Sequence, residues 1–129
     1  MANKIYTVFV ADDDEFILDV ISIMLGGAGY VVKTTNNAED LFSIIGDSPD
    51  LILLDLWMSG INGKDICIKL KNQLSTKHIP IILISANSNV EEIVRQCGAD
   101  DYISKPFEMD ALLQKVSDTL MKFHTGDNH

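Results

Sequence analysis

A run of four apolar residues that ends in an acid, Leu51 to Asp55, constrains the fold of this chain more than any other segment. A strand that is apolar at every position is typical of a parallel sheet covered on both faces. Three other apolar runs also end in polar or charged side chains: Asp12 and Asp13, then Ser85, and finally Lys105. Ligands of open α/β sheets bind beyond the carboxyl ends of the strands, so these strand ends predict one shared site.

Strand-like and helix-like segments alternate along the chain. We expect strands at about Tyr6–Ala11, Val31–Thr35, Leu51–Asp55, Ile81–Ile84 and Asp101–Ser104. Such alternation predicts a parallel sheet with helices on both faces and right-handed crossovers. A closed barrel of eight such units needs about 250 residues, whereas this chain has 129. The predicted fold is therefore α/β, a flavodoxin-like (βα)5 doubly wound open parallel sheet with strand order 2-1-3-4-5.

The helical segments carry apolar side chains at three- and four-residue spacing, which gathers them on one face of each helix. The first helix is expected from about Glu15 to Gly26. The inward positions of the other four are Ala38, Leu41, Phe42 and Ile45 after a capping Asn37; Ile66, Leu70 and Leu74; Val90, Ile93, Val94 and Cys97; and Met109, Leu112, Leu113, Val116 and Leu120. Gly98 is suited to end the fourth of the five helices in a left-handed conformation.

The size and charge of the chain limit its function. At 129 residues it fits one domain, which we place at residues 5–121, with a frayed tail at 122–129. The net charge of −9 and the pI near 4.5 argue against nucleic acid or anionic membrane as a partner, because both favour basic proteins. A divalent cation or a basic partner fits this chain better.

The cysteines and the length of the apolar runs bear on the compartment. Cys67 and Cys97 lie in helical patterns without CxxC spacing or nearby histidine pairs, so we expect buried free thiols rather than a zinc site or a disulfide framework. No basic-then-apolar segment opens the sequence, and no apolar run approaches the ~18 residues of a membrane span. We expect a cytoplasmic protein.

Three strand-end acids, Asp12, Asp13 and Asp55, are expected to share a small volume. Repulsion between them and desolvation would raise their pKa values, so a cation should lie among them. Oxygen ligands without histidine or thiolate favour Mg²⁺. Asp14 lies closest to the following helix, and we expect it to be the N-cap instead.

Lys105 and Ser85 complete the set of strand-end side chains. A lysine ammonium neutralises an acidic pocket and holds a phosphoryl oxygen as a point charge; the alternative is a solvated lysine. Lys105 precedes Pro106, and a minority of peptide bonds before proline are cis. A cis bond here would fix the direction of the Lys105 side chain. Ser85 can donate its hydroxyl hydrogen to a phosphoryl oxygen, and its alternative role is that of a turn or cap serine.

These fragments together resemble the receiver domain of bacterial two-component response regulators. The resemblance extends from about residue 5 to residue 121 and rests on Asp12–Asp13, Leu53–Leu56, Ile84–Ala86 and Gly98–Phe107. It implies that Asp55 is the nucleophile that accepts a phosphoryl group from a phosphohistidine, while Ser85 and Lys105 contact the transferred group. The implied Mg²⁺ ligands are Asp12, Asp13, Asp55 and the backbone carbonyl oxygen of Trp57.

The resemblance also implies a switch and a timer. Tyr102 matches an aromatic position whose ring moves when the phosphoryl group draws Ser85 inward, which changes the surface of the last two helices and the last strand. Trp57 and Asn87 match positions that tune hydrolysis of the aspartyl phosphate. A large indole beside the phosphoryl group would exclude water, so we expect a long-lived phosphorylated state. The alternatives are a half-buried strand tyrosine and a surface tryptophan that contacts a partner.

Two rival functions use the same residues. Asp12 and Asp14 also fit the DxD motif of haloacid-dehalogenase-like phosphatases, but the closing acid pair of such an enzyme should follow a strand, whereas Asp100 and Asp101 precede one. Asp55 would then have no role. The second rival is a degenerate receiver that binds partners without phosphorylation, and the complete set of acids, hydroxyl and lysine argues against it.

The implied partners are proteins. A sensor histidine kinase or a histidine phosphotransfer protein would supply the phosphoryl group, and a downstream protein target would read it. A phosphorylation-dependent homodimer is a further option. The chain would not be an enzyme for outside substrates, since it would catalyse only its own phosphorylation and slow dephosphorylation. The sequence leaves open which kinase and target apply, and whether the chain is free-standing or part of a larger protein.

Overall fold

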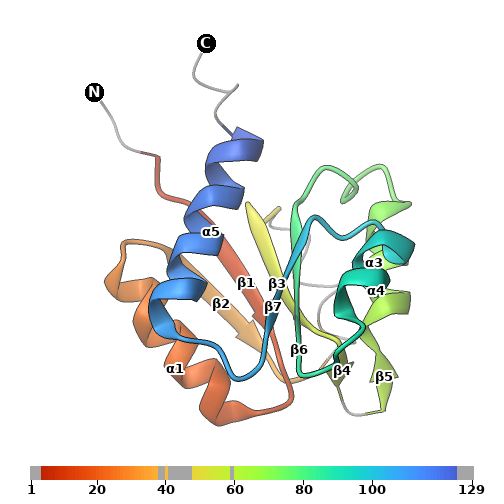
Figure 1. Cartoon of the computed structure of the whole chain (residues 1–129). Coiled ribbons are helices and arrows are strands. Elements are labelled where there is room, and N and C mark those ends of the chain that lie inside the picture. Colours follow the sequence, from red (N-terminus) through yellow and green to blue (C-terminus); the bar gives the residue numbers. More distant parts are fainter. Residues whose placement is uncertain (1–3, 38–39, 41–47, 59, 125–129) are drawn as a thin grey trace.

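The structure is a computed structural model that describes residues 4–37, 40, 48–58 and 60–124. Within these residues five strands form one parallel sheet in the order β2-β1-β3-β6-β7. The strands are β1 (Thr7–Ala11), β2 (Val31–Thr35), β3 (Leu51–Asp55), β6 (Ile81–Ser85) and β7 (Asp101–Ser104). Counted among themselves they follow the predicted order, and their carboxyl ends point to the lower edge of Figure 1.

The described helices lie on both faces of this sheet (Figure 1). One face is covered by α1 (Glu15–Gly27) and α5 (Met109–His124), the other by α3 (Gly63–Lys71) and α4 (Val90–Cys97). We call them the α1/α5 face and the α3/α4 face. The predicted doubly wound α/β architecture is confirmed. The helix expected after Asn37 falls, apart from Asp40, outside the described residues.

Each face has its own apolar core because successive residues of a strand point to opposite sides. The strand residues that pack under α1 and α5 are Val8, Val10, Leu51, Leu53, Ile82, Ile84 and Ile103. Those that pack under α3 and α4 are Phe9, Ala11, Ile52, Leu54, Ile81 and Leu83. Every residue of β3 and β6 is buried, as expected of central strands.

Three local expectations are met: the Asp14 cap, the Gly98 turn and the buried free cysteines. Asp14 caps α1, since its Oδ1 accepts the backbone N–H groups of Phe16 at 2.9 Å and Ile17 at 3.4 Å. Gly98 follows α4 in the left-handed conformation, with a φ of 81°. Cys67 and Cys97 are buried free thiols. None of the described helices combines the length and the apolar character that a bilayer span requires.

The end of α3 contradicts the expectation for Leu74. The helix ends at Lys71, and Leu74 is 83% exposed rather than part of the core. Side chains satisfy the last carbonyl groups: the Asn72 amide donates to the oxygen of Ile68 at 2.8 Å, and the Thr76 hydroxyl donates to that of Leu70 at 2.6 Å. A further helical turn is therefore not needed.

Both ends of α5 also differ from the expectation. Met109 opens the helix and is 48% exposed, although Leu112, Val116 and Leu120 are buried as expected. Residues 122–124, assigned to a frayed tail, form the last turn of α5. His124 makes two of the contacts that hold this turn. His124 Nε2 lies 3.1 Å from the carbonyl oxygen of Asp50, and its ring lies 5.3 Å from that of Tyr6.

A short antiparallel hairpin follows β3, and the sequence analysis did not predict it. Its strands are β4 (Trp57–Met58) and β5 (Ile61–Asn62), with Trp57 opposite Asn62. Asn62 then caps α3, because its Oδ1 accepts the backbone N–H of Lys64 at 2.9 Å. The hairpin fixes the segment between Asp55 and α3.

Candidate functional site

Three charged side chains meet beyond the carboxyl ends of the strands. Lys105 Nζ lies 2.9 Å from Asp12 Oδ2 and 3.7 Å from Asp55 Oδ2. The two carboxylates are buried, with residue exposures of 0% and 7%, and Lys105 is partly exposed. The sequence predicted this convergence, and we call these three residues the acid–lysine cluster.

Strand order explains why the acid–lysine cluster forms. β1 and β3 are neighbours in register, with Ala11 opposite Leu54, so the acids that follow these two positions lie side by side. Lys105 follows β7, which β6 separates from β3. Its long side chain reaches across the end of β6 to both acids. The Lys105–Pro106 peptide bond is cis, the less common of the two forms that the sequence allowed.

The cluster holds more negative than positive charge. Burial and, next, the charge of Asp12 raise the pKa of Asp55 from 3.8 to about 6, although Lys105 and the backbone N–H of Trp57 act in the opposite direction. Asp12 Oδ1 accepts the backbone N–H of Asp14 at 2.9 Å. Its Oδ2 is buried, with the Lys105 ammonium nearby but no well-directed hydrogen bond. A further cation near these oxygens would lower the energy of the site.

The donor set agrees only in part with the expected Mg²⁺ ligands. Asp12 and Asp55 supply neighbouring carboxylate oxygens, the ligands that Mg²⁺ prefers. Asp13 is exposed, unlike Asp12 and Asp55. In the described part of the chain no three His, Cys, Asp or Glu side chains are gathered as a ready metal site. The residues therefore fit an ion that binds to one or two carboxylates and keeps several waters.

Ser85 ends β6 beside the cluster. Ile84 is opposite Asp55 in register, so Ser85 lies one residue further along the neighbouring strand. Its Oγ accepts the backbone N–H of Asn87 at 2.9 Å, which is the turn role that the sequence left open. A hydroxyl that accepts a hydrogen bond still has its own hydrogen to donate. The two roles considered for Ser85 are compatible.

Trp57 borders the cluster but lies largely in solvent. Its backbone N–H donates to Asp55 Oδ1 at 3.4 Å, whereas its side chain is 56% exposed. An indole in this position leaves part of the site open to water. The structure therefore gives limited support to the expected shielding, which stays a prediction.

Tyr102 lies in β7 on the α3/α4 face, where it packs partly buried against the core of that face. It is opposite Leu83, two residues before Ser85 on the same side of β6. Lys115 Nζ lies 5.4 Å from the centre of its ring. Ser85 and Tyr102 thus share one side of the sheet, as a coupled switch requires.

Gly63 is a site residue that the sequence analysis missed. A Cβ atom there would lie 2.7 Å from the carbonyl oxygen of Asp55 and 2.8 Å from Leu56 Cα, closer than atoms approach in proteins. The Gly63 N–H donates to the carbonyl oxygen of Leu56 at 2.6 Å. Only a residue without a side chain lets α3 begin against the end of β3. The sequence offered no signal beyond a glycine in a loop.

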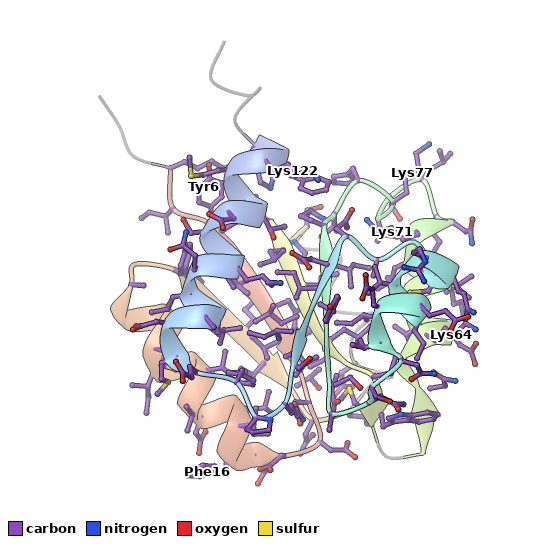
Figure 2. The ribbon with its side chains drawn as sticks, viewed as in Figure 1. Tyr6, Phe16, Lys64, Lys71, Lys77 and Lys122 are labelled. Carbon is purple, nitrogen blue, oxygen red and sulfur yellow. The ribbon has the colours of Figure 1, made fainter. Side chains whose placement is uncertain are left out.

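An apolar cavity of 640 Å³ adjoins the cluster on the α1/α5 face. Its wall includes Lys105 and Pro106 together with Phe16, Val20 and Met109. Phe16 is 74% exposed at the start of α1 (Figure 2). This cavity was not predicted from the sequence.

Comparison with known proteins identifies the family. The sequence model of the family described as the response regulator receiver domain matches residues 8–117 of this chain. The chain belongs to this family. It is a receiver domain of the two-component response regulator type.

Two curated relatives illustrate the match. The phosphate regulon transcriptional regulatory protein PhoB of Pseudomonas aeruginosa is 34% identical over 125 residues, which is 95% of this chain and 55% of that protein. The nisin biosynthesis regulatory protein NisR of Lactococcus lactis is 38% identical over 117 residues, or 87% of this chain and 49% of that protein. This receiver domain spans about half the length of these relatives.

Solved structures show the same fold. The receiver domain of NtrX from Brucella abortus has a TM-score of 0.78 at 30% identity, covering 89% of this chain and 98% of that chain. A CheY-like receiver domain protein from Methanospirillum hungatei has a TM-score of 0.86 at 25% identity, covering 95% and 99%. The flavodoxin-like prediction agrees with both.

Proposed function

We propose that this receiver domain accepts a phosphoryl group on Asp55 from a phosphohistidine of a sensor kinase or a histidine phosphotransfer protein. The observation that carries the proposal is the acid–lysine cluster, in which Lys105 lies 3.7 Å from Asp55 and 2.9 Å from Asp12 at the strand ends. A carboxylate nucleophile beside an ammonium group is the arrangement that phosphoryl transfer to an acid requires.

The residues of the chain divide the work of this transfer. Asp55 has a pKa near 6 and is ionised at neutral pH, so no general base is needed. One of its oxygens attacks phosphorus while the phosphorus–nitrogen bond of the phosphohistidine breaks and the imidazole leaves. Lys105 then turns from the acids toward an equatorial phosphoryl oxygen, and the Ser85 hydroxyl donates to another. The backbone N–H of Trp57 orients the nucleophile.

The same site would hold Mg²⁺, with oxygens from Asp12, Asp13, Asp55 and the Trp57 carbonyl as its ligands. The ion supplies positive charge that offsets the charge of the phosphoryl oxygens and of the two buried carboxylates. The charge excess of the acid–lysine cluster supports this assignment. The exposed Asp13 would contribute through water or after a side-chain rotation.

Phosphorylation would be read through Ser85 and Tyr102. A phosphoryl group adds nearly two negative charges, which attract the Ser85 hydroxyl and leave space for the Tyr102 ring. The surface of α4, β7 and α5 would then bind a downstream protein or a second copy of the chain. Trp57 and Asn87 would set the lifetime of this state. Such a domain would act in the cytoplasm and catalyse only its own phosphorylation and dephosphorylation.

The rival phosphatase finds less support. That mechanism uses Asp14 as its acid, but the Asp14 carboxylate caps α1. Asp100, one of the acids proposed to close the site, pairs with Lys71 at 2.8 Å instead. Both acids therefore already have structural partners.

Incubation with a small phosphodonor, with and without Mg²⁺, tests the proposal. We expect Mg²⁺-dependent incorporation of one phosphoryl group per chain in the wild type, and none in Asp55→Asn. Incorporation that survives in Asp55→Asn but fails in Asp12→Asn would favour the phosphatase. No incorporation under any condition would favour a degenerate receiver.

A further inference from the structure

Two thiols meet between α3 and α4, on the side of the sheet away from the acid–lysine cluster. Cys67 lies in α3 and Cys97 is the last residue of α4, and 30 positions separate them in sequence. Cys67 Sγ lies 3.6 Å from the carbonyl oxygen of Cys97. Both residues belong to the apolar core of the α3/α4 face, with exposures of 0% and 4%. The phosphotransfer mechanism uses neither.

The two thiols are close neighbours, but their surroundings make them chemically unequal. Hydrogen bonding from the Cys67 thiol lowers the pKa of Cys97 to about 6, although burial opposes this effect. The same contact, together with burial, raises the pKa of Cys67. Cys97 is therefore the thiol of the pair that loses its proton more readily. In the folded chain Cys67 Sγ lies 3.6 Å from the carbonyl oxygen of Cys97, and Cys97 Sγ lies 3.9 Å from that of Val94. A thiolate is the nucleophilic form of cysteine, whereas an isolated thiol in a core is inert.

The surroundings of Cys97 favour a small oxidant. The residue ends its helix and precedes Gly98, whose left-handed turn lies at the surface. Lys64 adds positive charge nearby and hydrogen-bonds with Gln96 at 2.7 Å. Figure 2 shows Lys64 on the outer side of the molecule, where α3 and α4 lie side by side. Cys97 is 4% exposed and Cys67 is 0% exposed, so a reagent from solvent meets Cys97 first, and a small peroxide fits such a narrow opening better than a bulky disulfide.

We propose that Cys67 and Cys97 form a peroxide-sensitive dithiol that closes into a reversible disulfide and ties α3 to the end of α4. The Cys97 thiolate attacks one oxygen of hydrogen peroxide, the oxygen–oxygen bond breaks, and a sulfenic acid and hydroxide form. Cys67 then loses its proton and its sulfur attacks Cys97 Sγ, so that the sulfur–oxygen bond breaks and water leaves. Two thiols are oxidised, and one peroxide is reduced to two waters.

Mass spectrometry of the purified full chain tests this proposal without any substitution. The chain is treated with hydrogen peroxide, denatured, alkylated and digested with trypsin, which places the two cysteines in separate peptides because Lys69 and Arg95 lie between them. We expect one cross-linked pair of peptides, a loss of two hydrogen masses from the monomer, and full reversal by dithiothreitol. Oxidised glutathione should react far more slowly than peroxide.

Single variants separate the roles of the two thiols. In Cys67→Ala the sulfenic acid on Cys97 has no partner, so we expect it to be trapped by dimedone, with more irreversible oxidation than in the wild type. Cys97→Ala should react slowest, because only the thiol with the raised pKa remains. Circular dichroism checks that each variant folds.

Three outcomes would overturn the proposal: both thiols remaining free after peroxide treatment, both oxidising independently without a cross-link, or a disulfide that forms only between two chains. The inference is independent of the phosphotransfer function, because its readout is the state of two thiols outside that site. Failure of Asp55 to accept a phosphoryl group would leave it intact.

Discussion

The strand-end side chains divide between the two faces of the sheet. Successive side chains of a strand point to opposite faces, and this alternation places Asp12, Asp55 and Lys105 on the α1/α5 side. There they form the acid–lysine cluster. Ser85 and Tyr102 fall on the α3/α4 side, as do the two cysteines. The first group is suited to bind a phosphoryl group, and the second lies where helices can respond to it. The site thus joins chemistry on one face to a packed helical layer on the other.

Two lysines, one for each face, test this division most strongly. Lys105 belongs to the acid–lysine cluster, whereas Lys71 pairs with Asp100 at 2.8 Å and donates to the carbonyl oxygen of Ile79 at 2.9 Å. We expect Lys105→Ala to slow phosphorylation by about 10²–10³-fold, because it removes the charge that holds the phosphoryl oxygen. Lys71→Ala should leave that rate unchanged and lower the free energy of unfolding by about 1–3 kcal/mol.

The phosphorylation rate of each variant is measured in quenched time courses, and its free energy of unfolding is measured in urea. A slow rate in Lys71→Ala, or an unchanged one in Lys105→Ala, would break the proposed separation between the faces.

Gly63 lies where α3 begins against the end of β3. A methyl group at this position should disturb both the packing of α3 and the site around Asp55. Gly63→Ala places a carbon 2.7 Å from the carbonyl oxygen of Asp55, so α3 or the end of β3 must shift. We expect a loss of about 1–3 kcal/mol in the free energy of unfolding, with slower phosphorylation. Gly26→Ala is the matched control, because its added methyl group meets no atom within 4 Å. If the two variants had equal free energies of unfolding in urea, the close approach of position 63 to the Asp55 carbonyl oxygen would not constrain the fold.

The pH dependence of stability sharpens the comparison by isolating one buried charge. The folded chain raises the pKa of Asp55 from 3.8 to about 6, so the folded state binds this proton more tightly than the unfolded state. The stability that the protonated Asp55 contributes to the fold is therefore lost as the pH rises from about 4 to about 6. Above that range Asp55 is ionised, and burial of its charge lowers the free energy of unfolding by the full amount. Asp55→Asn removes the penalty and should raise the free energy of unfolding at pH 7 by about 1–3 kcal/mol.

Urea unfolding at several pH values measures this difference, with the exposed Asp19→Asn as the control that should follow the wild type. If the gain of Asp55→Asn over the wild type were as large at pH 4 as at pH 7, burial of the charge would not be its cause.

The smallest expected effect concerns the lifetime of the phosphorylated state. Trp57 is 56% exposed, so its indole can cover the phosphoryl group only in part. We expect Trp57→Ala to lose phosphate severalfold faster than the wild type, as measured by release of phosphate from the labelled chain. Leu74→Ala, which removes another exposed apolar side chain, should not change the rate. Identical lifetimes of the phosphorylated state in all three proteins would show that Trp57 does not shield the phosphoryl group.

The sequence was sufficient for features that depend on strand ends and periodicity. The convergence of Asp12, Asp55 and Lys105 follows from parallel strands that share one edge, and the Asp14 cap follows from its position before the helix. These features are set by local pattern and by the topology that the pattern dictates.

Features that depend on packing between segments were beyond the sequence. Gly63 is required by the approach of α3 to β3, and α3 ends early because the side chains of Asn72 and Thr76 take its last carbonyl groups. The hairpin of β4 and β5 and the contact between Cys67 and Cys97 likewise join residues that no periodic pattern links. Their positions are decided by tertiary contacts.

The most direct test of the central claim is to identify the phosphorylated residue. An acyl phosphate on aspartate is reduced by borohydride to homoserine, which mass spectrometry locates by residue. After phosphorylation in the presence of Mg²⁺, the account predicts homoserine at position 55 and nowhere else. Conversion at Asp12, or at no aspartate at all, would contradict it.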